Sequence, residues 1–253
     1  MTGRMRVGTA LVAGLLGFVA QASAQIPGMP LFTNPRYGTG IRVHADLGQF
    51  TKAGTLGNEN TVVQGGATFA LGPLGIGANI GTNFQRARTL AGGTDTVGLQ
   101  DNFSGSAIAQ LRILGGGRNP LALSIFGGAT AEITAQEVAA ATAHVKVPRL
   151  MNFPVGAALG FHVPLGISSL NLWGAGRMVF TKYMNCPSTD YTGLPEYSTW
   201  CSTTDKNFRW TVGADLPILK IFSVRAAFDS GKQDGVTMSA WGVGASIGIG
   251  GMR

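Results

Sequence analysis

Ten long segments of the chain alternate apolar residues with polar or small ones, and this pattern constrains the fold more than any other feature. In the clearest segment, Phe208 and Trp210 alternate with Arg209 and Thr211. Successive side chains of a β-strand point to opposite faces, so a period of two gives each strand one apolar and one polar face. The segments begin near residues 41, 63, 74, 102, 121, 151, 169, 207, 222 and 241. The sequence therefore predicts an all-β fold.

The length of the segments favours a membrane protein. They run to roughly 10 to 14 residues, whereas a bilayer-spanning strand needs about 9 to 11 and soluble strands average about 5 or 6. A spanning helix is not expected, because the uncharged stretch 150–176 is interrupted by Pro154 and Pro164. Only 12% of the residues are charged, about half the usual share, which agrees with a large apolar surface.

The connections between these segments alternate between short and long. Short turns with Pro or Gly are expected at 71–74, 115–120, 163–166 and 216–218, and longer loops at 51–60, 86–101, 135–149, 184–206 and 230–236. Short turns on one side and long loops on the other predict an antiparallel up-and-down β-barrel of about ten strands. Both chain termini of the barrel then lie on the short-turn side.

This architecture resembles that of bacterial outer-membrane β-barrel proteins of the porin-like kind, over nearly all of residues 37–250. The resemblance implies a transmembrane β-barrel in the bacterial outer membrane, with membrane lipid around it, short periplasmic turns and longer extracellular loops. The alternative is a soluble secreted β-barrel or sandwich that binds a small ligand.

The first 24 residues have the features of a secretory signal peptide. Arg4 and Arg6 precede a short apolar stretch, and a small-x-small sequence ends at Ala24. The expected organisation is a signal peptide at 1–24, an N-terminal lead-in at 25–36 and the barrel at 37–253. Without Arg4 and Arg6 the formal net charge of +7 becomes +5.

Charged side chains on the polar faces are candidates for lining a lumen, because an Arg at the lipid midplane would cost about 2–4 kcal/mol. The candidates are Arg42, Asp46, Arg112, Glu132, Arg177, Arg209, Asp215 and Arg225. We expect the long Arg side chains to reach across toward a half of the lumen lined by small residues, and to pair with Asp46, Glu132, Asp215 or Asp229. They would either plug the barrel or line a narrow passage that favours a small anionic solute.

The longest loop, 184–206, contains both cysteines of the chain. Cys186 and Cys201 are expected to form a disulfide in an exported protein, which would stabilise the loop by roughly 3 kcal/mol. Tyr191 and Trp200 lie in the same loop, so a surface interaction or adhesion role is the alternative function.

Motifs for catalysis or cofactor binding are not found in the sequence. His44 lies within a predicted strand, His162 near a short turn, and only His144 lies in a long loop. There is no G-x-S-x-G motif, and the spacing of the cysteines without a nearby His does not fit a metal site. We therefore expect no enzyme, no metal or other cofactor and no nucleic acid partner.

Overall fold

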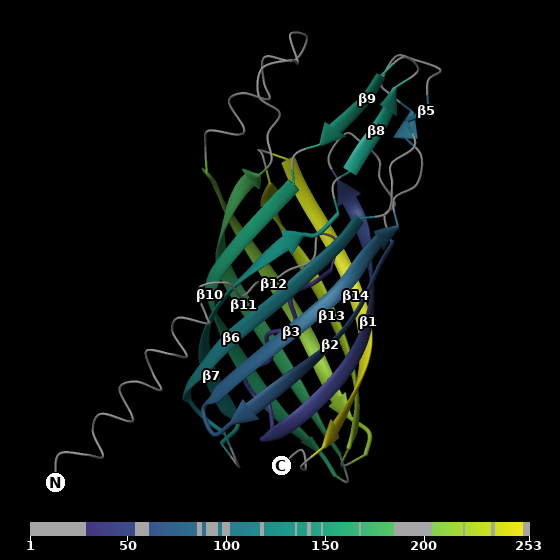
Figure 1. The fold of residues 1–253 in the computed structure, drawn as a ribbon. Coiled ribbons are helices and arrows are strands. Elements are labelled where there is room, and N and C mark those ends of the chain that lie inside the picture. Colours follow the sequence, from purple (N-terminus) through teal and green to yellow (C-terminus); the bar gives the residue numbers. More distant parts are fainter. Residues whose placement is uncertain are drawn as a thin grey trace, which may run out of the picture.

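A computed structural model of the chain shows a closed β-barrel whose ten strands follow one another around the wall (Figure 1). The structure describes residues 29–53, 61–84, 88–89, 96–97, 102–116, 119–134, 136–140, 143–147, 149–166, 168–184, 204–219, 221–233 and 236–249. The barrel strands are β1 (Gly40–Ala53), β2 (Thr61–Leu71), β3 (Leu74–Phe84), β6 (Asn102–Leu114), β7 (Leu121–Glu132), β10 (Arg149–Leu165), β11 (Ser168–Met184), β12 (Thr204–Pro217), β13 (Phe222–Gln233) and β14 (Val236–Ile249). The ten-stranded antiparallel barrel predicted from the alternation is confirmed.

Neighbouring strands pair antiparallel around the whole ring. The ring closes where β1 pairs with β14, with Ile41 opposite Ile249 and Ala53 opposite Met238. Pairing of β10 with β7 is interrupted at Phe153 and Pro154, where proline has no N–H to donate. Closure leaves no free edge strand, which is the condition for a sheet to cross a bilayer.

Two small hairpins stand apart from the barrel wall. β8 (Gln136–Ala140) pairs with β9 (Ala143–Val147) inside the region predicted as loop 135–149, and Figure 1 shows this hairpin beyond the barrel rim. β4 (Arg88–Thr89) pairs with β5 (Thr96–Val97). Both therefore lie in the predicted long connections.

The prediction of a long loop at 230–236 is wrong. β13 and β14 remain paired up to Gln233 opposite Val236, so only two residues connect them. The connecting residues are Asp234 and Gly235, a pair that favours tight hairpins because both positions tolerate a positive φ. Four of the five connections on this side are therefore long.

The outer face of the barrel is apolar and exposed. Large side chains from strands around the ring are 40–60% exposed, including Val43 at 52%, Ile80 at 56%, Leu159 at 51%, Val212 at 48% and Ile247 at 55%. A soluble barrel buries such residues inside, so this distribution contradicts the soluble alternative and fits a lipid-facing surface. Among the described residues, no helix is long and apolar enough to cross a membrane.

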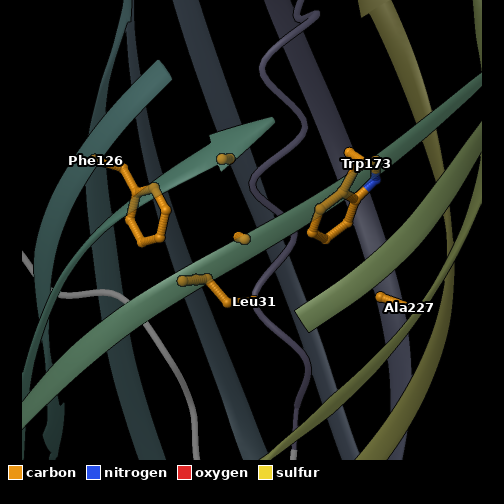
Figure 2. Packing of buried hydrophobic residues seen from close by; sticks show 6 residues of the cluster. Leu31, Phe126, Trp173 and Ala227 are labelled. Carbon is orange, nitrogen blue, oxygen red and sulfur yellow. The ribbon is translucent and has the colours of Figure 1, made fainter. Parts of the chain in front are cut away.

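The inside of the barrel contains residues 29–39, which we call the plug segment. Met29, Leu31, Thr33 and Pro35 are buried there, although the segment precedes the first strand. Leu31 packs in a cluster with Phe126 of β7 and Trp173 of β11, the two strands that flank β10 (Figure 2). The lead-in predicted at 25–36 is thus part of the barrel interior from Met29 onward.

Candidate functional site

The upstream part of the plug segment occupies the middle of the lumen. Met29 packs against Val62 of β2, and a Cβ on Gly242 of β14 would lie 2.8 Å from Pro30 Cδ. The Phe32 ring lies under the Arg225 guanidinium, 4.2 Å from its Cζ to the ring centroid. These contacts come from β2, β13 and β14, which are consecutive with β1 around the ring, so this part of the segment lies against the wall near the β1–β14 closure.

The downstream part of the plug segment is held by polar contacts near the short turns. Asn34 Nδ2 donates to Asp215 Oδ2 of β12 at 2.5 Å, and Gln110 Nε2 of β6 donates to the Thr33 carbonyl at 3.3 Å. Tyr37 donates its hydroxyl to the Pro73 carbonyl in the β2–β3 turn. Burial raises the pKa of the Tyr37 phenol, so this hydroxyl stays a neutral donor at physiological pH.

Glycines in the wall make room for the plug segment. A Cβ at Gly160 of β10 would lie 2.6 Å from Pro35 Cγ, and one at Gly75 of β3 would lie 3.2 Å from the Tyr37 ring. Gly75 and Gly160 lie in the half of the lumen that the sequence predicts to be lined by small residues. The predicted pairing of lumen arginines with acids is confirmed for Asp46 and Asp229, while the plug segment, which the sequence did not predict, occupies the space beside Gly75 and Gly160.

Two predicted lumen arginines share one buried aspartate. Arg177 of β11 and Arg209 of β12 lie directly opposite each other, and Asp229 of β13 bonds to both. Arg209 donates to Asp229 Oδ1 from Nε at 3.0 Å and from Nη2 at 2.6 Å, while Thr211 Oγ1 donates to Oδ2 at 2.5 Å. Arg177 is 1% exposed and Asp229 0%. The aspartate therefore offsets two like charges placed side by side.

A second ion pair spans the strand that closes the ring. Arg225 of β13 donates from Nε and Nη2 to Asp46 of β1, at 2.7 and 2.6 Å, across Gly244 of β14. Gln64 Nε2 donates to the same carboxylate at 2.9 Å. A side chain at position 244 would collide with Asp46, so this glycine is required by the pair.

The other predicted lumen residues lie toward the two ends of the barrel. Arg112 donates to the carbonyls of Tyr37 and Gly72 at the short-turn end, at 3.2 and 3.0 Å. Glu132 accepts from the Leu150 backbone N–H at 2.8 Å at the long-loop end. Asp215 is buried beside the plug segment, and Arg42 is half-buried nearby.

Sequence reasoning named Asp46 and Asp229 among the acids expected to pair with the arginines, and the structure confirms both, but it missed the plug segment and the sharing of Asp229 by two arginines. Pairing across strands depends on register, which alternation alone does not reveal. The predicted disulfide between Cys186 and Cys201, the aromatic residues of loop 184–206, the predicted signal peptide and residues 25–28 of the predicted lead-in lie outside the described residues, and these remain predictions.

Comparison with known proteins finds similarity in fold only. No family model matches the chain, and no curated protein matches it. Among solved structures, the beta domain of the Bordetella autotransporter BrkA is similar with a TM-score of 0.53 and 10% identity, covering 84% of this chain and 100% of that chain. The translocator domain of the autotransporter NalP from Neisseria meningitidis has a TM-score of 0.45 and 13% identity, covering 97% of each chain. The outer-membrane protease OmpT from Escherichia coli has a TM-score of 0.36 and 7% identity, covering 86% of this chain and 98% of that one.

The closed ring, the apolar exterior and the polar interior define the class of protein. The chain is a β-barrel of the bacterial outer-membrane type, with lipid around its exterior. The particular feature of this barrel is the plug segment inside its lumen.

Proposed function

We propose that the protein is a narrow outer-membrane channel whose pore is closed by its own plug segment and conducts small anions when that segment moves. The observation that carries the proposal is the position of residues 29–39, which fill the small-residue half of the lumen. A ten-stranded barrel lies between eight-stranded barrels filled by side chains and 16-stranded ones with an open channel. Its lumen is therefore wide enough to need such a segment to close it.

The nature of the contacts supports a movable plug. Thr33 and Asn34 are each held to the wall by one hydrogen bond, and Tyr37 by three hydrogen bonds and the Arg112 guanidinium over its ring. Each hydrogen bond is worth about 0.5–1.5 kcal/mol net, or somewhat more where a charged group such as Asp215 takes part. The wall, in contrast, is joined by continuous strand ladders and the buried ion pairs of Asp46 and Asp229. The plug segment can therefore leave at a lower free-energy cost than any strand.

The lining of the lumen supports a preference for anions. Arginines outnumber carboxylates among the predicted lumen residues, five to three: Arg42, Arg112, Arg177, Arg209 and Arg225 against Asp46, Glu132 and Asp215. Asp229 adds one more carboxylate, so these nine named residues together carry a formal charge of +1. The two lumen histidines have structural roles in this proposal: His44 Nε2 lies 2.6 Å from Asn79 Oδ1 and His162 Nδ1 lies 2.9 Å from Asn171 Oδ1.

The proposal is tested by single-channel recording across a planar bilayer in a salt gradient. We expect wild-type protein to be mostly closed, and the variant N34A/Y37A to show longer, anion-selective openings because it loses two polar anchors of the plug segment. The matched control is N152A, which truncates a lumenal Asn that accepts from Thr181 and has no contact with the plug segment.

Correct insertion of each variant is checked by a heat-modifiable gel band. Equal open times in wild-type protein, N34A/Y37A and N152A would contradict a closing role for the plug segment. Cation-selective openings would contradict the proposed preference for anions.

A further inference from the structure

A cavity of about 70 Å³ lies at the short-turn end of the lumen, between the plug segment and the wall. Phe32, Asn34 and Tyr37 form its inner side, and Arg42, Ile108 and Asp215 are among its wall residues. By the same measure a single water molecule needs about 10–15 Å³, so this space admits a small solute of only a few heavy atoms. The cavity exists because Gly75 and Gly77, which also line it, carry no side chains.

Arg42 is the one charged wall residue of this cavity without a direct bond to a described residue. The structure records no hydrogen bond or ion pair for its guanidinium with the described part of the chain, although the side chain is half-buried on the lumen face of β1. Arg225, which also lines the cavity, is already bonded twice to Asp46, and Asp215 is bonded to Asn34. Arg42 therefore has N–H donors available to a solute in this cavity, where its charge also interacts with that of Asp215.

The charge around the cavity favours a monovalent anion. The described charged residues that line the cavity are two arginines, at positions 42 and 225, and one aspartate, at position 215. The formal surplus is +1, and Asp215 would repel a dianion. The Phe32 ring and Ile108 supply apolar surface next to Arg42, as a short hydrocarbon group requires.

We propose that this cavity binds a small monocarboxylate, whose carboxylate pairs with Arg42 in the two-bond geometry that guanidinium favours and whose apolar group lies against Phe32 and Ile108. The site deepens the proposed function, since it lies at the entrance on the short-turn side, which faces the periplasm in outer-membrane barrels. The binding site requires the plug segment in its position inside the lumen but does not require a conducting pore.

The test is a binding titration of the refolded protein in detergent micelles at low chloride, by calorimetry and saturation-transfer NMR. The probe is propionate, and its neutral isostere propionamide serves as the ligand control. We expect saturable one-to-one binding of propionate and none of propionamide. R42Q should weaken propionate binding by about tenfold or more, because it removes a charge-assisted pair. R149Q is the matched control, as Arg149 lies at the opposite end of the barrel, at the start of β10.

Three results would overturn the site: equal binding of propionate and propionamide, equal affinity of R42Q and R149Q, or tighter binding of inorganic phosphate than of propionate. The comparison of propionate with propionamide uses wild-type protein, so it tests whether binding requires the carboxylate even if R42Q does not fold. Propionate binding by a protein that never conducts would contradict the channel and leave the site standing. Anion-selective openings without propionate binding would support the channel and contradict the binding site.

Discussion

The buried aspartate that joins two arginines provides the sharpest test of how this barrel is stabilised. In D229A, the guanidinium groups of Arg177 and Arg209 remain opposite each other inside the lumen without a carboxylate. Removing one partner of a buried ion pair costs about 3–5 kcal/mol, because the remaining charge is left uncompensated. Here two charges are left, and the four bonds that Asp229 accepts from Arg177, Arg209 and Thr211 are all lost. We therefore expect a loss of at least about 3 kcal/mol in the free energy of unfolding.

The assay is reversible urea unfolding in lipid vesicles, followed by tryptophan fluorescence. Trp210 lies next to Phe228 on the lipid-facing side, with ring centroids 5.7 Å apart, and reports on the same strands. D205N, a change in the same strand near its long-loop end, is the control and should stay within about 0.5 kcal/mol of wild type.

A variant that removes all the charges at once separates net stabilisation from the cost of leaving a charge unpaired. Replacement of a buried ionic triad by apolar residues of similar size is often neutral. R177M/R209M/D229L should therefore be more stable than D229A. A loss below about 1 kcal/mol in D229A, or a triple variant less stable than D229A, would refute this account of the cluster.

Three further outcomes follow from other contacts. G160L places a side chain where Pro35 lies, so it should displace the plug segment and lengthen channel openings, as measured by planar-bilayer recording. G244V should break the Asp46–Arg225 pair by collision with the carboxylate and lower the urea midpoint, whereas a change of equal size on the outer face should not. The two cysteines of the chain should resist alkylation until reductant is added, and reduction should destabilise their loop by roughly 3 kcal/mol.

Much of the barrel follows from the sequence, because a period of two is a property of neighbouring residues. The faces of β12, for example, follow directly from the alternation of Phe208 and Trp210 with Arg209 and Thr211. The long segments also indicate that the apolar face meets lipid. The Asp234–Gly235 sequence, which favours a short hairpin connection, was a local signal that the prediction of a longer loop did not use.

The interior was less predictable, because it depends on contacts between residues far apart in the chain. Residues 29–39 have no periodicity, so alternation cannot place them, and the small residues Gly75 and Gly160 only signal that space exists. Arg225 bonds to Asp46 and not to Asp215, which lies directly opposite it on β12. This bond requires that position 244, between Arg225 and Asp46, has no side chain. Such choices depend on three-dimensional register, not on the order of residues along one strand.

The position of the plug segment has a consequence for the order of assembly. The segment is continuous with β1, and β1 pairs with β14 at the other end of the sequence, so the ring closes through the contact that is most distant along the chain. Contacts between distant residues form late, since they must overcome the largest loss of chain entropy. A nascent open sheet would therefore wrap around residues 29–39 before it closes. After closure, the contact of Phe32 with Arg225 and the bond of Arg225 to Asp46 across β14 stabilise the pairing of β1 with β14 from inside the lumen.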